Sequence, residues 1–161
     1  MTLAELELPG GTFTLRKADA ADVGAIVGLL AADPLRAAVE SLAIEDRRPY
    51  DLAFASIDAD PAQLLVVVSA GQAVVATMQL TFIPGLARRG TGRMQVEAVR
   101  VQSDLRGNGL GSAMIRWAIE EGRRRGVKLV QLTSDGSRTA AHRFYERLGF
   151  EASHVGFKLP L

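Results

Sequence analysis

The feature that most constrains this chain is a glycine-rich turn between an expected strand and an expected helix. The turn reads Arg106-Gly107-Asn108-Gly109-Leu110-Gly111, and Ser112 follows it within amphipathic sequence. Three glycines in five residues let the backbone turn sharply and approach a ligand, because no Cβ stands in the way. Amide N–H groups at a helix start, with the positive end of the helix dipole, attract phosphate or pyrophosphate. Arg106 adds a forked cationic donor, so the sequence predicts an anion-binding turn.

Two other nucleotide-binding turns are excluded by spacing. The Walker A pattern requires Lys-Ser or Lys-Thr after its last glycine, whereas Gly111 is followed by Ser112-Ala113. The dinucleotide-binding fingerprint requires three glycines at a different spacing. At this point one alternative interpretation remains: a simple strand-to-helix turn whose glycines serve only strained backbone positions.

Apolar periodicity divides the rest of the chain into short strands and helices. The turn Ala70-Gly71-Gln72 predicts a hairpin, and Asp19 or Asp22 is available to cap the first helix. Residues 150–161 are left for one or two terminal strands. The expected strands are 12–16, 64–69, 73–82, 94–101 and 127–132, and the expected helices are about 20–32, one beginning near 109, and one carrying Ala141, Phe144, Tyr145 and Leu148 and closed by Gly149.

Between Asp33 and Pro61 the pattern is mixed. Leu35, Ala38, Val39 and Leu42 have helical spacing, whereas Glu45 to Tyr50 is typical of a loop that a short helix can follow. No boundary is predicted there. With no linker or repeat visible, we expect one domain over residues 1–161, built as a mixed sheet with helices on its faces.

Composition narrows the functional classes. Nineteen basic and eighteen acidic residues leave a formal charge of +1, which gives no global field for capturing nucleic acid. The absence of cysteine excludes a disulfide framework, a thiolate metal site and a cysteine nucleophile. Met1 to Gly10 lacks the pattern of a signal peptide, and no run reaches the ~20 apolar residues of a membrane helix. We therefore expect a cytoplasmic protein that binds neither nucleic acid nor membrane.

The strand, the Arg-x-x-Gly-x-Gly turn and the helix resemble the acetyl-CoA signature of the GNAT acetyltransferase superfamily. The run from Ala140 to Phe150 is similar to that family's second motif, and the resemblance covers roughly residues 92 to 152. It implies an α/β (α+β) fold with a mixed, mostly antiparallel sheet of six to seven strands flanked by about four helices. It also implies acetyl-CoA as co-substrate, with its pyrophosphate on the amides of Gly107 to Gly111 and its pantetheine arm paired with the backbone of Val99 and Val101.

The resemblance implies an N-acetyltransferase that acts on a primary amine of a small molecule or peptide. An amine with a pKa near 10.4 is about 99.9% protonated three units lower, so a general base is needed. Glu97 is the candidate, because strand alternation is expected to place it on the same face as Val99 and Val101, acting directly or through a water. An exposed strand glutamate or a structural ion pair is the alternative.

The leaving thiolate benefits from a proton donor, and the resemblance assigns that role to Tyr145. A helix tyrosine that only packs, as Phe144 does, is the alternative. Ser134 ends an expected strand facing the coenzyme and can donate a hydrogen bond to it, although serine there also favours turns. His142 and His154 make no metal-ligand cluster, so no metal site is expected.

Two alternative functions would use the same glycine-rich turn. One is a non-catalytic acyl-CoA-binding or sensing module, and the other is an enzyme with a longer acyl donor. The acceptor is open among aminoglycosides, polyamines, amino acids and protein N-termini. Exposed strand edges in such sheets favour a homodimer.

Overall fold

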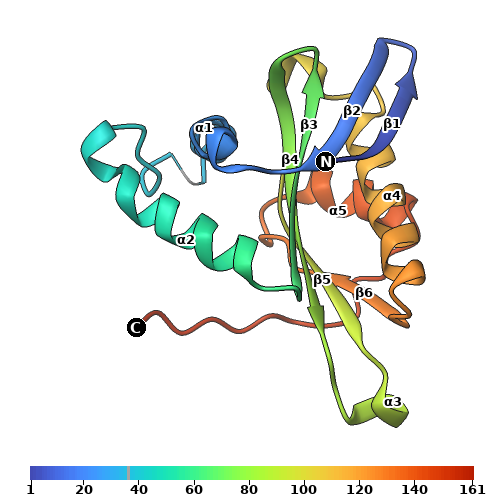
Figure 1. The fold of residues 1–161 in the computed structure, drawn as a ribbon. Helices are drawn as coiled ribbons and strands as arrows, with labels where there is room; N and C mark the ends of the chain where they lie inside the picture. The colour runs from blue at the N-terminus through green and yellow to red at the C-terminus, as the bar shows by residue number, and fades with distance from the viewer. Residues whose placement is uncertain (36) are drawn as a thin grey trace.

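One six-stranded sheet forms the centre of the protein (Figure 1). The computed structural model describes residues 1–35 and 37–161. Neighbouring strands follow the sequence order and pair antiparallel, except that β5 and β6 pair parallel. The strands are β1 (Thr2–Leu8), β2 (Gly11–Lys17), β3 (Gln63–Ala70), β4 (Ala73–Ile83), β5 (Arg93–Val101) and β6 (Leu129–Leu132).

Helices cover both faces of this sheet. In Figure 1, α1 and α2 lie on one side and α4 and α5 on the other. The expected mixed, mostly antiparallel fold is therefore confirmed, with six strands. The helices are α1 (Val23–Ala31), α2 (Arg47–Ala59), the single turn α3 (Ala87–Gly90), α4 (Leu110–Arg124) and α5 (Thr139–Arg147), with 3-10 turns η1 (Ala20–Asp22), η2 (Ile44–Asp46) and η3 (Ser103–Leu105).

The core has two parts, one under each helical layer. The larger part packs the sheet against α4 through Met114, Ile115 and Ala118, and α5 adds half-buried aromatic residues at its margin. The smaller part packs Leu65 and Val67 of β3 against α1 and α2. Because β3 is central and covered on both faces, its apolar run is not interrupted by polar residues, and three consecutive valines are fully buried: Val66, Val67 and Val68.

Most elements near the expected coenzyme site are confirmed. The hairpin of β3 and β4 turns at Gly71 (φ +59°). The strand β5 and the helices α4 and α5 lie where the periodicity predicts them. Met114 is fully buried, as its position on the apolar face of α4 indicates.

In the N-terminal third, β2 and α1 confirm the predicted strand and helix, and the departure from the sequence predictions is at β1. No strand is predicted before residue 12, yet β1 pairs with β2; the alternation of Glu5 and Glu7 with Leu6 and Leu8 is the signal that was missed. On the exposed side of this edge hairpin, Thr12 donates a hydrogen bond to Glu7 and Thr14 to Glu5 (Oγ1 to Oε2, 2.8 and 3.0 Å). The sheet therefore ends at β1 in a strand that carries carboxylates.

The segment from Glu45 to Tyr50 is helical, so the prediction of a loop there is wrong. It contains most of η2 and the first turn of α2, where the missing N–H of Pro49 costs no helical hydrogen bond. The helical spacing noted in the sequence runs from Leu35 to Leu42. This range contains Arg36, which lies outside the described residues. Residues 37–43 are described, and they form turns and irregular structure with no helix.

The terminal strands expected in residues 150–161 do not form in the described chain. After α5 the chain continues without regular structure, crossing β4 and β5 in the view of Figure 1 and ending beneath α2. A strand requires a partner ladder, and this segment has none in the structure.

An ion pair anchors the start of α1. Arg16 of β2 binds both carboxylate oxygens of Asp22 (2.6 and 2.7 Å), whose side chain is 7% exposed. Asp19 accepts a hydrogen bond from the N–H of Ala21, and Asp22 accepts one from Asp19 in return. Burial alone would raise the pKa of Asp22, but the bonds from Arg16 and the Asp19 N–H outweigh it and lower that pKa.

We expect Asp22→Asn to lower the free energy of unfolding by about 2 to 3 kcal/mol at pH 7. The carboxylate has a lowered pKa in the folded state, so its contribution is present above the unfolded pKa of about 3.9 and is lost as the pH falls through the folded pKa. Urea unfolding from pH 7 to pH 2.5 checks this. The control Asp58→Asn removes a half-exposed ion pair with Lys17 and should cost less than about 1 kcal/mol. Equal costs at Asp22 and Asp58 would contradict the assignment.

Candidate functional site

The two parallel strands in the centre of the C-terminal half separate. β5 pairs with β6 only from Arg93 to Val96, whereas its pairing with β4 continues to Val101. Beyond Val96 the β6 side of β5 therefore has no strand neighbour in the described chain. The carbonyls of Val99 and Val101 accept side-chain hydrogen bonds, from Arg100 Nη1 (2.7 Å) and Arg106 Nε (3.0 Å), and so face away from β4.

A bulge at Ala98 changes which side chains share a face. Ala98 has φ +52°, and the register with β4 shifts so that Glu97 pairs with Gln79 and Arg100 with Thr77. Directly paired residues share a face, which puts Glu97 and Arg100 on the side of α1 and α2. The expectation that Glu97 shares a face with Val99 and Val101 is wrong, because the extra residue resets the alternation and both valines pack toward α4.

The glycine-rich turn presents unbonded amides beside this opening. Gly107 and Gly109 have φ of +81° and +87°, the region that favours glycine. A Cβ on Gly107 would meet nothing within 4 Å, and residues 106–109 are exposed. In the described part of the chain, the N–H groups from Gly107 to Ser112 make no hydrogen bond, as expected at a helix start. Asn108 is exposed here and Ser112 is half-buried.

The turn is held close to β5 and α5. Leu110 is 1% exposed and packs in the core, so only its backbone can face a ligand. A Cβ on Gly111 would lie 3.5 Å from Phe144 and 3.8 Å from Val101, so glycine allows α4 to approach both neighbours closely. The hydrogen bond of Arg106 to Val101 keeps this guanidinium near the end of β5.

Tyr145 lies half-buried at the margin of the larger core. Its ring makes edge contacts with Phe144 and Phe150 at centroid distances of 5.0 and 5.8 Å. Burial raises the pKa of the Tyr145 phenol, and the positive charges of Arg100 and Arg138 oppose part of that rise. The phenol is therefore protonated at neutral pH and can donate a proton.

A buried carboxylate joins the two arginines near Tyr145. Asp33, with a side chain 5% exposed, follows α1 and binds Arg100 of β5 (2.6 Å) and Arg138 before α5 (2.5 Å) through Oδ2. Burial alone would raise the pKa of Asp33, but the bonds from Arg138 and the Leu35 N–H, with both guanidinium charges, lower it. Sequence reasoning missed this cluster, because no motif links residues that are far apart in the chain.

The remaining candidates lie around the open end of the sheet. Ser134 is half-buried in the segment that joins β6 to α5. Next to it, Asp135 accepts hydrogen bonds from the backbone and side chain of Ser137 (2.9 and 2.6 Å), and its carbonyl contacts His142 Nε2 (2.9 Å). Among the described residues, no group of histidine, aspartate and glutamate side chains could hold a metal ion. No described helix has both the length and the apolar character that crossing a membrane requires.

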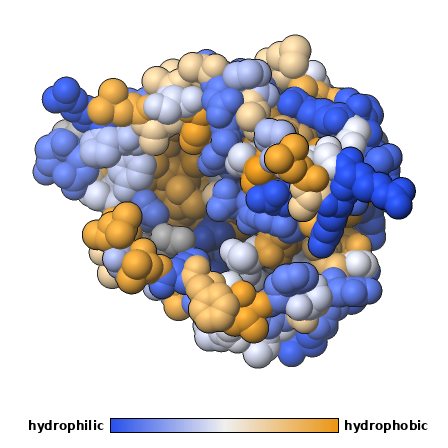
Figure 2. Space-filling view, turned by 90° about the horizontal axis from the view of Figure 1, so that it is seen from below, coloured by the Kyte–Doolittle hydropathy of each residue, from blue (hydrophilic) through white to orange (hydrophobic). Residues whose placement is uncertain are grey.

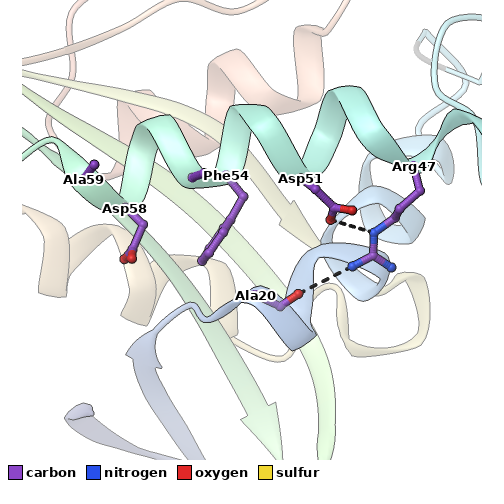
Figure 3. Close-up of a pocket in the computed structure, with 7 residues that line it drawn as sticks. Ala20, Arg47, Asp51, Phe54, Asp58 and Ala59 are labelled. Carbon is purple, nitrogen blue, oxygen red and sulfur yellow. Dashed lines mark hydrogen bonds and ion pairs between the residues drawn. The ribbon is translucent and has the colours of Figure 1, made fainter.

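A separate pocket of about 570 Å³ lies beside α2 and contains none of the predicted site residues. Figure 3 shows it between α2 and Ala20, with Phe54 pointing into it and Arg47 bound to Asp51 and to the Ala20 carbonyl. Figure 2 shows a hollow on the face seen from below, with hydrophobic residues in its depth and both hydrophobic and hydrophilic residues around it. The molecule therefore has concave surface outside the glycine-rich turn.

Comparisons with known proteins agree with this geometry. The model of the acetyltransferase (GNAT) family matches residues 33–150. The chain belongs to the acetyltransferase (GNAT) family. The match includes the separated strands, the glycine-rich turn and the helix that carries Tyr145. Solved structures support the same fold: a transcriptional regulator from Bacillus halodurans C-125 is 40% identical, with a TM-score of 0.90 over 92% of this chain and 99% of that one.

Further relatives are acetyltransferases by name. A putative acetyltransferase from Agrobacterium tumefaciens str. C58 is 27% identical, with a TM-score of 0.80 over 91% of this chain and 99% of that one. An aminoalkylphosphonate N-acetyltransferase from Salmonella typhimurium is 38% identical over 67 residues, which are 42% of this chain and 44% of the relative. An uncharacterized N-acetyltransferase of Methanocaldococcus jannaschii is 39% identical over 38% of this chain and 27% of its own length. The chain thus spans less than half the length of these two curated relatives.

We expect Asp33→Asn to lower the pKa of Tyr145, because the positive charges of Arg100 and Arg138 then lose their carboxylate. The chain has two tyrosines, so a Tyr50→Phe background isolates the Tyr145 signal. Ultraviolet absorbance of the phenolate between pH 8 and pH 12 measures the midpoint. The matched control Asp46→Asn changes a carboxylate that binds Ser41 and should leave the midpoint in place. An unchanged or higher midpoint in Asp33→Asn would contradict the electrostatic coupling.

Proposed function

We propose that the chain is an acetyl-CoA-dependent N-acetyltransferase that acylates a primary amine. The observation that carries this proposal is the set of unbonded amides from Gly107 to Ser112, exposed from Gly107 to Gly109, beside the open edge of β5. Such amides at a helix N-terminus suit a pyrophosphate. An extended backbone edge without a neighbouring strand suits an amide-bearing arm that pairs as an added strand.

The residues present fit this coenzyme. The amides of Gly107 to Gly111 would hold the pyrophosphate, with Arg106, Asn108 and Ser112 around them. The outward backbone groups of Val99 and Val101 would bind the pantetheine arm, and Ser134 would donate from the opposite side of the opening. Gly107 supports this role most directly, because its φ favours glycine and no atom occupies the space in front of it.

Two side chains would move the protons of the transfer. The coenzyme supplies an acyl thioester, which an amine can attack only as the free base. Glu97, exposed just before the bulge, would accept the amine proton directly or through a water. Tyr145 would donate its phenolic proton to the leaving sulfur, and burial favours the protonated phenol that this step needs.

The proposed acceptor class comes from a relative of the chain. The Salmonella typhimurium relative is named for acetylating aminoalkylphosphonates. We therefore place an aminoalkylphosphonate first in an acceptor panel that also contains amino acids, polyamines, aminoglycosides and peptide N-termini. Release of the thiol from acetyl-CoA is measured with each amine of the panel, and it identifies the acceptor whichever class the amine belongs to.

Arg106→Glu should weaken acetyl-CoA binding by about 10- to 100-fold, because it removes a charged donor and adds a like charge near the pyrophosphate. Titration calorimetry or a thermal-shift series measures this; at a hundredfold excess over Kd the wild type gains about 2.7 kcal/mol of stability. The control Arg116→Glu makes the same charge change at an exposed position of α4. Equal affinity of wild type and Arg106→Glu would remove the proposed phosphate site.

Tyr145→Phe should lower kcat by about 100-fold or more, since general acid catalysis typically contributes at least that factor. Coenzyme affinity should change little, because the ring and its packing remain. Tyr50→Phe is the matched control, because the Tyr50 hydroxyl binds Glu40 and the Ser41 N–H instead. Unchanged turnover in Tyr145→Phe would remove the acid role while leaving the coenzyme site untouched.

A second candidate function is a non-catalytic acyl-CoA-binding module. It is favoured by the Bacillus halodurans structure, which is 40% identical and is described as a transcriptional regulator. Both candidates predict coenzyme binding through the turn. Binding of acetyl-CoA without thiol release for any amine in the panel would favour the module, and release above the hydrolytic background would favour the enzyme.

A further inference from the structure

Two guanidinium groups share the single buried carboxylate of Asp33. Its Oδ2 atom binds Arg100 and Arg138, and its Oδ1 atom accepts a hydrogen bond from the N–H of Leu35 (3.1 Å). Both carboxylate oxygens are therefore occupied. Because one carboxylate balances only one of the two guanidinium charges, the cluster keeps an uncompensated positive charge that can attract an anion.

Arg138 has donors left for such an anion. A guanidinium carries five N–H groups, and in the described part of the chain this one makes hydrogen bonds and ion pairs only with Asp33, through Nη2. The Arg138 side chain is 32% exposed, compared with 15% for Arg100. Because a planar guanidinium can bind a carboxylate or a phosphonate through two parallel hydrogen bonds, Arg138 suits an acidic group that arrives from solvent.

The cluster lies beside the proposed proton-transfer residues. Arg100 and Glu97 share the face of α1 and α2, and their partners on β4 are two residues apart. The two side chains therefore leave the sheet roughly 7 Å from each other along the strand. Arg100 and Arg138 also act on the Tyr145 phenol: burial raises its pKa, and both guanidinium charges oppose that rise. An amine bound at Glu97 is thus a few bonds away from a guanidinium.

We propose that the acceptor is a primary amine that also carries an acidic group, a carboxylate or a phosphonate, which Arg138 binds together with Arg100. This inference rests on the proposed function and adds the substrate class. In the transfer, the amine nitrogen bonds to the acyl carbon, the carbon–sulfur bond breaks, the amine proton passes to Glu97, and the sulfur receives the proton of Tyr145. The acidic group is left unchanged, so it serves only to bind and orient the acceptor.

Charge complementarity favours this class over the other amines of the panel. An acceptor with one positive and one negative end would meet a carboxylate at Glu97 and a guanidinium at Arg138. A polyamine would bring a second positive charge to the arginines, and this like-charge contact costs affinity. An amine with a neutral second group would lack the charge-assisted hydrogen bonds. The cluster therefore selects acceptors by charge.

Matched amines test the acceptor class on the wild-type chain. β-Alanine and aminoethylphosphonate carry an acidic group, whereas β-alanine amide keeps the skeleton of β-alanine without a negative charge. At equal concentrations of free amine, we expect kcat/KM for thiol release from acetyl-CoA to be about 10- to 100-fold higher with an acidic amine than with the amide. The two acidic amines distinguish a carboxylate from a phosphonate. Calorimetric titration of each amine into protein saturated with coenzyme A, which carries no acyl group, measures acceptor binding without turnover.

Arg138→Gln should raise KM for the acidic amines by about 10- to 100-fold, with kcat close to the wild-type value and little change for β-alanine amide. Arg147→Gln is the matched control, because it removes the same charge from an exposed position at the end of α5. A cluster that only holds α1 against the sheet would change both classes of amine alike. Circular dichroism melting verifies that each variant is folded, and the wild-type comparison keeps the test valid if Arg138→Gln does not fold.

The outcomes separate this inference from the proposed function. Thiol release without a preference for acidic amines, or a best acceptor in the panel that has no acidic group, would overturn the acidic-group site while the enzyme remains. Equal effects of Arg138→Gln on both classes of amine would do the same. Preferred binding of the acidic amines without thiol release for any amine would keep the site and overturn the proposed catalysis. Neither preferred binding nor release would overturn both.

Discussion

The unequal pairing of β5 controls the arrangement of the candidate site. Its antiparallel ladder with β4 runs to Val101, whereas its parallel ladder with β6 stops at Val96. A positive φ at Ala98 costs about 1 to 3 kcal/mol, and the β4 ladder on both sides supports it. The bulge lets one strand serve two purposes: it presents polar side chains to the face of α1 and α2, and apolar ones to α4.

The Asp33 cluster connects parts of the chain that the sheet alone does not join. A carboxylate after α1 holds one guanidinium from β5 and another from the segment before α5. Two cations around one buried anion leave a net positive charge near the Tyr145 phenol. The same contacts that fix the position of α1 against the sheet thus also set the electrostatic surroundings of the proposed acid.

Local patterns predicted β2, α1 and most elements from β3 to α5, but they did not predict β1, and the strands expected after residue 149 do not form in the described chain. The turn from Arg106 to Ser112 could be predicted, because the glycine spacing and the amphipathic sequence that follows it determine its shape. The reversed face of Glu97 could not be predicted, since Ala98 carries no mark of a bulge. The start of α2 was missed because Pro49 is typical of loops, although it is tolerated in a first helical turn. The ion pairs of Asp33 depend on tertiary contact and leave no local pattern.

The sheet edge opposite β6 is β1, which differs from β6 in carrying acidic side chains. The edge strand β1 carries Glu5 and Glu7, each accepting a hydrogen bond from a threonine of β2. Two β1 edges brought together would set like charges near one another, which resists sheet growth in this direction. That resistance weakens when salt screens the carboxylates. High salt is thus the condition in which two copies of this protein would pair most readily through their first strands.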